Sequence, residues 1–191
     1  MPLRKYNIGY FLLNHGEYDK AISYFNEAIR LWPNYAEAHN NLGLALYRQG
    51  KITEATSQFY EAVRINPENP KAQNNLGSAL AQAGRLDEAI QHFNESLRIN
   101  PNNARAQSNL ASALTKLGKF DDAIVHFSIA LDLNPSNPDT HCNLGLIYLQ
   151  KGEIDKAILE FNEALAINPN FTKAREKLQI ALEKRNMGTQ H

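Results

Sequence analysis

Two apolar stripes, each with the spacing of an α-helix, recur along the chain and are separated by short polar turns. In residues 36–69 the first stripe carries Leu42 and Leu46, and the second carries Ala55 and Phe59. Apolar residues at steps of three and four lie on one face of an α-helix, so this segment predicts two amphipathic helices. Polar residues fill the other positions, which indicates that each helix has a solvent-facing side.

Glycine and proline give these helix pairs a fixed period. Glycine adopts the left-handed conformation that ends a helix, and proline cannot continue a helix. Both residue types recur five times at 34-residue steps, and a period of this length indicates stacked repeats. The residues concerned are Gly16, Gly50, Gly84, Gly118 and Gly152, and Pro33, Pro67, Pro101, Pro135 and Pro169.

Small residues and a phenylalanine share the same period and predict the core. Gly43 on a first helix and Ala55 on the following second helix let the two backbones approach closely, and Phe59 fills the space beside them. Ala111 replaces this glycine in the fourth copy. The expected core phenylalanines are Phe25, Phe59, Phe93, Phe127 and Phe161.

The period also divides the chain into segments. We expect repeats at residues 2–35, 36–69, 70–103, 104–137 and 138–171, a capping helix at 172–185, and a flexible tail at 186–191. Asn69, Asn103 and Asn137 are placed to cap the helices that follow them. In the cap, Ala174 and Leu178 are expected to cover the last repeat, with Lys173 and Lys177 facing water.

A 34-residue helix–turn–helix unit with Leu-Gly on its first helix, and then Gly, Ala, Phe, Ala and Pro in these phases, resembles the tetratricopeptide repeat (TPR). The resemblance covers residues 2–171. It implies an all-α, right-handed superhelical solenoid of five repeats plus a C-terminal capping helix. In such a solenoid the first helices line a concave groove. The slot that holds an aromatic residue in many relatives is polar here: Lys5, His39, Gln73, Gln107 and His141.

Composition narrows the function classes. Lys+Arg and Asp+Glu number 20 each, so the net charge gives no general attraction to nucleic acid. No apolar run approaches the roughly 18 residues that a membrane-spanning helix needs, so we expect no membrane insertion. The N-terminal residues lack the apolar core of a signal peptide, and a cytoplasmic location is expected.

Signals of catalysis are missing from the sequence. It has no glycine-rich nucleotide loop, no H-E-x-x-H and no C-x-x-C, so we expect neither an enzyme nor a cofactor. His39 and His141 share one repeat phase and His92 and His126 another, which spreads them over different repeats and argues against a metal site. Cys142 is expected to be a small residue of the groove wall.

An asparagine recurs in the middle of every first helix. Asparagine is a mediocre helix former, so its repetition needs a reason. Its amide offers donors and an acceptor, and can pair with the backbone of a bound peptide whatever that peptide's side chains. The column is similar to the asparagine ladder of O-linked N-acetylglucosamine transferases, which implies the same use. Alternatively, the asparagines bond the neighbouring repeat's backbone or record recent duplication. The column is Asn7, Asn41, Asn75, Asn109 and Asn143.

Other residues of the first helices are predicted to line the groove beside this column. They are Tyr6, Tyr10, Asn40, Leu44, Tyr47, Arg48, Lys71, Asn74, Ser78, Arg105, Ser112, Lys116 and Leu146. The basic members cluster in the middle repeats, which favours a peptide with central acidic residues, although these charges can equally be solvated.

Three hypotheses follow from the sequence. The first is a non-catalytic scaffold that binds a protein or peptide partner in the groove through the asparagine ladder. The second is a substrate-recruiting or regulatory segment of a larger enzyme such as a glycosyltransferase. The third is self-association through the N-terminal end, since Leu3 and Phe11 lie on a first helix that no cap precedes. More chain upstream, or simple tolerance of exposure, would also account for that end.

Overall fold

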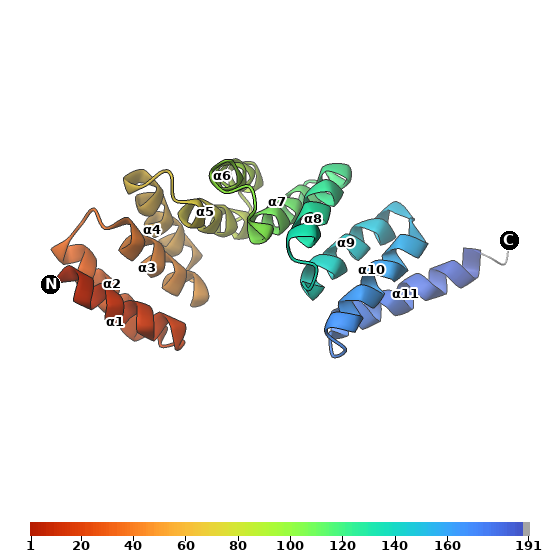
Figure 1. The fold of residues 1–191 in the computed structure, drawn as a ribbon, viewed down its shortest axis with the longest axis horizontal. Helices are drawn as coiled ribbons and strands as arrows, with labels where there is room; N and C mark the ends of the chain where they lie inside the picture. The colour runs from red at the N-terminus through yellow and green to blue at the C-terminus, as the bar shows by residue number, and fades with distance from the viewer. Residues whose placement is uncertain (189–191) are drawn as a thin grey trace. The chain divides into compact units, whose positions relative to one another are not determined.

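Residues 1–188 of the computed structural model form eleven α-helices in two compact units, which we describe separately (Figure 1). The first unit, Met1–Pro101, contains α1 (Pro2–Asn14), α2 (Tyr18–Leu31), α3 (Ala36–Arg48), α4 (Ile52–Ile65), α5 (Pro70–Gln82) and α6 (Leu86–Ile99). The second, from Asn102, contains α7 (Ala104–Lys116), α8 (Phe120–Leu133), α9 (Pro138–Lys151), α10 (Ile154–Ile167) and α11 (Thr172–Gly188).

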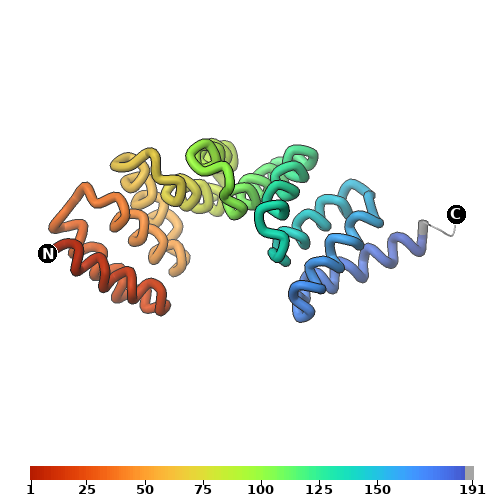
Figure 2. The backbone as a smooth tube through the Cα atoms, viewed as in Figure 1, coloured from red at the N-terminus to blue at the C-terminus, as the bar shows by residue number. Residues whose placement is uncertain are grey.

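Consecutive helices pack as antiparallel pairs, and α11 packs against α10 (Figure 2). The prediction of an all-helical chain with five helix pairs and a further helix is confirmed. No helix within residues 1–188 is long and apolar enough to cross a bilayer.

The turn inside each pair depends on its glycine. Gly50 has φ +76°, a conformation that residues with a Cβ adopt only at a cost, and the space around its missing Cβ is open. The backbone N–H of Lys51 donates to the carbonyl of Leu46 at 3.0 Å, which closes the end of α3. The second helix therefore starts immediately after the turn and returns along the first.

Asparagine caps start three of the first helices, as predicted. The Oδ1 of Asn69 accepts from the backbone N–H groups of Lys71 and Ala72 at 3.0 and 3.2 Å. Asn103 and Asn137 make the equivalent bonds at the starts of α7 and α9. Each bond satisfies a backbone donor that the helix leaves unpaired.

The predicted core is confirmed in each pair. A Cβ added to Gly43 would lie 2.7 Å from the ring of Phe59 and 3.2 Å from the carbonyl oxygen of Ala55. The five repeated phenylalanines are all fully buried. Glycine therefore allows the two helices to approach closely enough for the phenylalanine ring to lie against the first helix.

A polar side chain ties the second, third and fifth helix pairs to the turn before each of them, and it occupies the slot that the sequence left unexplained. His39 places Nε2 2.9 Å from the carbonyl oxygen of Pro33, and Nδ1 2.8 Å from Oε1 of Gln58. In the next repeat the residue types are exchanged, since the Nε2 of Gln73 donates to Pro67 and its Oε1 lies 2.8 Å from Nδ1 of His92. These histidines are structural, and residues 1–188 hold no His, Cys, Asp and Glu group suited to a metal ion.

The last helix covers the end of the second unit. Ala174 and Ala181 of α11 are fully buried and form one core cluster with residues of α10. Helix α11 continues to Gly188, beyond the predicted end of the cap at residue 185. Part of the expected tail is therefore helical, and its residues 189–191 lie outside the described residues.

Candidate peptide-binding surface

A chain of side-chain hydrogen bonds joins the first helices of the first unit. The amide nitrogen of Asn75 donates to Oδ1 of Asn40 at 3.0 Å. The amide of Asn40 donates to Oδ1 of Asn41 at 3.3 Å, and that of Asn41 donates to the Tyr6 hydroxyl at 2.9 Å. Asn41 and Asn75 thus each donate to the residue that precedes the column position in the repeat before them.

Burial separates the predicted contact residues into two groups. Asn40, Asn41 and Asn74 are only 8%, 9% and 4% exposed, so their side chains offer little surface to a partner. The prediction that these three contact a peptide directly is corrected, because the neighbouring helices bury them. For Asn41 the arrangement resembles the alternative in which a neighbouring repeat takes up the amide, although the acceptor is the Tyr6 side chain of the preceding repeat and not its backbone.

Other asparagines of the column keep open bonding atoms. Asn7 is exposed and has no side-chain hydrogen bond among the described residues. Asn75 is half-buried, and its Oδ1 receives no donor within residues 1–188. Asn143 is half-buried and accepts from Nζ of Lys173 at 3.3 Å, which leaves its amide nitrogen available to an acceptor. Asn109 is half-buried as well. The five asparagines therefore range from exposed, at Asn7, to buried, at Asn41.

Aromatic side chains extend this surface in the first repeat. The ring centroid of Tyr6 lies 4.8 Å from that of Tyr35 and 6.2 Å from that of Tyr10, which is half exposed. Burial raises the pKa of the Tyr6 phenol, with further contributions from Tyr35 and Glu37, so the hydroxyl stays neutral. Tyr6 can therefore accept from Asn41 and still donate its own proton outward.

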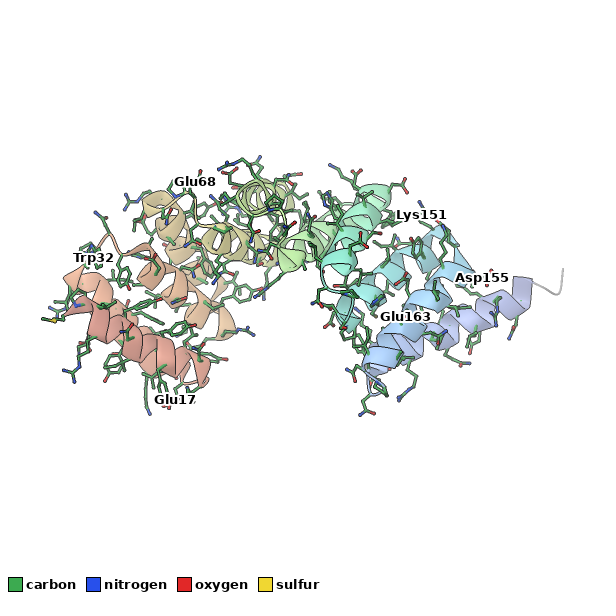
Figure 3. All side chains as sticks on the ribbon, viewed as in Figure 1. Glu17, Trp32, Glu68, Lys151, Asp155 and Glu163 are labelled. Atoms are coloured by element: carbon green, nitrogen blue, oxygen red, sulfur yellow. The ribbon has the colours of Figure 1, made fainter. Side chains whose placement is uncertain are left out.

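The aromatic series continues to a residue that the sequence analysis missed. Trp32, in the turn between α2 and α3 (Figure 3), stacks on Tyr35 at 4.7 Å and is 48% exposed. Other repeats hold an asparagine at this step of the period. The tryptophan at this position, in place of the asparagine of the other repeats, was the sequence signal that could have identified Trp32. The asparagines are Asn66, Asn100, Asn134 and Asn168.

The basic residues predicted for the groove are exposed. Arg48, Lys71, Arg105 and Lys116 make no ion pair within residues 1–188. Arg48 lines a pocket of about 430 Å³. The other lining residues are Leu13, Asn14, Gly16, Tyr18 and Leu44. The lining offers more polar than apolar surface, and with the open cation of Arg48 it suits a polar, acidic ligand.

The remaining predicted residues are less available. The Ser112 hydroxyl donates to the carbonyl of Ser108, and the Ser78 hydroxyl to that of Asn74, so each hydroxyl is bonded back to its own helix. Leu44 and Tyr47 are half-buried. Leu146 is half-buried and packs against the core cluster of α10. These side chains contribute apolar surface more than hydrogen bonds.

Two lysines of α11 belong to the surface, although the sequence analysis placed them in water. Lys177 follows Asn143 by 34 residues and so continues the asparagine column with a cation, and Lys173 follows Asp139 by the same step. Lys173 contacts Asn143 directly, and Lys177 is half-buried. Extending the repeat register into the capping helix would have identified both.

Cys142 does not line the surface. Its side chain is fully buried in the cluster that also contains Ala157, Phe161 and Ala174. Burial raises the pKa of its thiol, although Lys173 and Lys177 act in the opposite direction. The prediction of a groove-wall cysteine is therefore wrong, since this position faces α10 and α11.

Family models confirm what these repeats are. Tetratricopeptide repeat models match residues 6–70, 46–114, 80–128 and 138–171, and a TPR repeat model matches residues 111–152. The chain belongs to the tetratricopeptide repeat family. No curated protein matches it.

Solved structures of other proteins share the fold. YrrB, described as a TPR protein with an unusual peptide-binding site, is 23% identical with a TM-score of 0.75, over 92% of this chain and 91% of that one. The Cut9–Hcn1 hetero-tetramer of the APC/C gives 28% identity and a TM-score of 0.87, over 95% of this chain and 36% of that one. MamA from Desulfovibrio magneticus RS-1 gives 22% and 0.79, over 90% and 97%.

Proposed function

We propose that this TPR chain is a non-catalytic interaction module that binds a peptide segment of a partner protein along its first helices. The observation that carries the proposal is the presence of half-buried amides with one open bonding atom each, at Asn75 and Asn143. A half-buried polar atom gains more from a new hydrogen bond than a fully hydrated one, because it has less water to give up.

The open atoms complement a peptide backbone. Oδ1 of Asn75 would accept a peptide N–H, and the amide nitrogen of Asn143 would donate to a peptide carbonyl. Asn7 offers both kinds of group, and Asn41 acts indirectly by orienting the Tyr6 hydroxyl. Each such bond contributes about 0.5–1.5 kcal/mol, so the bonds that one unit makes add affinity without reading side chains.

Charge adds a preference to this backbone recognition. Arg48 and Lys71 lie exposed on α3 and α5, and Lys173 and Lys177 lie on α11. We therefore expect acidic side chains in the bound segment. Each exposed pair would contribute only about 0.2–1 kcal/mol, so the charges bias the choice of peptide more than they hold it.

The similarity to solved structures supports the proposed role as an interaction module at the level of the fold. YrrB, which has the same fold, is a TPR protein with a peptide-binding site, and Cut9 is part of a protein assembly. Because 490 solved chains match this fold, the fold itself does not select a partner. The side chains of the first helices must do so.

The test begins with a random peptide library selected against the immobilised chain. Fluorescence anisotropy then gives the Kd of one selected peptide for the wild type and for Asn75→Ala and Asn143→Ala. The variant whose unit holds the peptide should bind about 3–10-fold more weakly, the loss of one hydrogen bond. Asn94→Ala, an exposed asparagine of the second helix α6, is the matched control and should bind like the wild type.

Backbone recognition has its own signature in the peptide. N-methylation at one peptide position should weaken wild-type binding, and the same methyl group should have no effect on the Asn75→Ala variant if that N–H meets Asn75. Binding that both asparagine substitutions leave unchanged would remove the ladder from the mechanism.

A further inference from the structure

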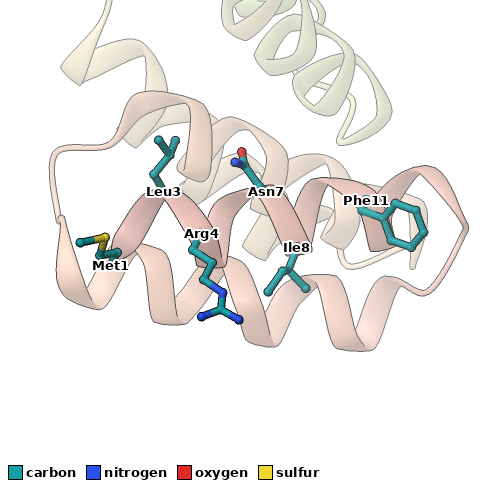
Figure 4. A pocket seen from close by; sticks show the side chains of 6 residues that line it. All are labelled: Met1, Leu3, Arg4, Asn7, Ile8 and Phe11. Atoms are coloured by element: carbon teal, nitrogen blue, oxygen red, sulfur yellow. The ribbon is translucent and has the colours of Figure 1, made fainter.

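Helix α1 carries an apolar surface that adjoins the proposed groove contacts at Asn7. Leu3 and Phe11 are 56% and 59% exposed, and Ile8 is half-buried. Together with Met1, Arg4 and Asn7 these side chains line a hollow of about 610 Å³ along one side of the helix (Figure 4). We name the three residues Arg4, Ile8 and Phe11 the α1 face.

The repeat register shows what covers this position elsewhere. The residues 34 positions after the α1 face are Ala38, Leu42 and Ala45 of α3, which are 0%, 3% and 0% exposed. Helix α3 packs on α2, the second helix of the preceding repeat. The same register on α5, α9 and α11 is filled by Ala72, Leu76 and Ala79, by Thr140, Leu144 and Ile147, and by Ala174, Leu178 and Ala181.

In each of these cases a second helix lies against the face. Helix α5 packs on α4, α9 on α8, and α11 on α10. On α10, Ala157, Phe161 and Ala164 are buried in one cluster with Ala174 and Ala181 of α11 and Cys142 of α9. The covering element is therefore an amphipathic helix with a stripe of small and apolar residues.

The α1 face differs from its counterparts by a charge and by size. Arg4 is exposed, has no acidic partner within residues 1–188, and takes the place of buried Ala38. Phe11 is much larger than Ala45. A helix that covers this face must bring a carboxylate to Arg4 and a small residue opposite Phe11, because an unpaired cation at a desolvated contact is costly.

A second copy of this chain fits the face poorly. In a two-fold contact of two α1 faces centred on Ile8, each Arg4 would lie near Phe11 of the other copy and would find no carboxylate on that face. At the other end of the chain, Gln179 follows Gly145 by 34 residues, is exposed, and donates to Glu183 at 2.9 Å. That side of α11 is polar. It therefore lacks the apolar stripe that a helix of a second copy would need to cover the α1 face.

We propose that the α1 face binds an amphipathic α-helix of a partner protein, which covers Ile8 and Phe11 and pairs an aspartate or glutamate with Arg4. The three residues of the α1 face are not among the proposed groove contacts, and Asn7 borders both surfaces.

The test uses a probe taken from the chain's own packing. It is a synthetic peptide with the α10 sequence, Ile154–Ile167, in which Ala164 is replaced by glutamate. Since α10 and α11 run antiparallel, Ala164 lies toward the start of α11, where Ala174 has the register of Arg4. A lactam bridge on the solvent side keeps the peptide helical, because isolated helices of this length are marginal in water.

Binding is mapped by ¹H–¹⁵N shifts of the full chain. We expect saturable shifts along α1 and at least about a tenfold loss of affinity in Phe11→Asp, from the burial of an unpaired charge. In a charge exchange, Arg4→Glu should lose the glutamate peptide and gain the peptide with lysine at that position. Asn75→Ala should leave this binding unchanged, which separates the result from the groove proposal.

Three results would overturn the proposal. The first is a set of shifts confined to the groove residues, and the second is the absence of saturable shifts. The third is a concentration-dependent dimer in sedimentation that Phe11→Asp abolishes, because the α1 face would then be covered by a second copy, as the sequence-based expectation of self-association has it. Arg4 and Phe11 are exposed, and an unchanged Tm confirms that each variant is folded.

Discussion

The amide nitrogen of Asn41 lies 2.9 Å from the hydroxyl oxygen of Tyr6, and this bond connects the first helices of two successive repeats. Asn41 is buried, so its amide has little water to replace that partner. The bond therefore stabilises the contact between repeats and fixes the direction of the Tyr6 hydroxyl.

Tyr6→Phe should destabilise the chain by about 1–3 kcal/mol, because it leaves the Asn41 amide buried without an acceptor. Urea unfolding followed by circular dichroism gives the free energy. Tyr10→Phe is the control, since the Tyr10 hydroxyl makes no hydrogen bond among the described residues, and it should change little. Equal stability of both variants would mean that water reaches Asn41.

Gly43→Ala should destabilise the chain by about 1–3 kcal/mol of steric strain, less the roughly 1 kcal/mol that alanine gains in helix propensity. The new Cβ would lie 2.7 Å from the buried ring of Phe59. The fourth repeat offers the reverse test, because Ala111 is already fully buried at this register. There Ala111→Gly should also lose stability, through a cavity and a more flexible helix. A gain in either variant would contradict this account of the close approach.

Helix pairs, turns and core phenylalanines could be read from the sequence because each has a local cause. Gly50 needs a positive φ, Phe59 needs the space beside Gly43, and Asn69 caps the helix that follows it. These requirements involve one repeat at a time, and the same pattern recurs in the other repeats.

The surface was predicted less well because it depends on contacts between repeats. Asn40 and Cys142 share one register, and a helical wheel places both near the groove. The structure buries them, since the adjacent helices approach that side of the first helix. Lys177 was assigned to solvent because the repeat register was not carried into α11.

Stability should fall as the pH drops from about 7.5 to about 5.5, because His92 and His126 are half-buried. Burial lowers the pKa of both imidazoles below the ordinary value of 6.5. The unfolded chain therefore takes up protons first, and stability present above pH 6.5 is lost as the pH falls toward the folded-state pKa. The pH dependence of the free energy of unfolding, measured by urea unfolding, should shrink in the double variant His92→Gln/His126→Gln. The variant His15→Gln, at an exposed site, should retain it.

Cys142 should react with a disulfide reagent more than about a hundredfold more slowly in the native chain than in denaturant, since the thiol is reached only in rare open states. Its raised pKa also reduces the reactive thiolate. A matched variant, Ser136→Cys with Cys142→Ala, places the only thiol in an exposed turn and should react at once. Equal rates for the two proteins would show that the core cluster around α10 opens readily.

The hydrogen bonds between Asn40, Asn41 and Asn75 follow a rule that can be iterated. In an Asn-Asn pair, the first asparagine accepts a hydrogen bond from the next repeat, and the second donates a hydrogen bond to the preceding repeat. Inserting another copy of such a repeat would extend this series of hydrogen bonds by one repeat and require no new residue type. A protein built in this way can gain or lose whole repeats while the polar side chains between its first helices keep their hydrogen-bond partners.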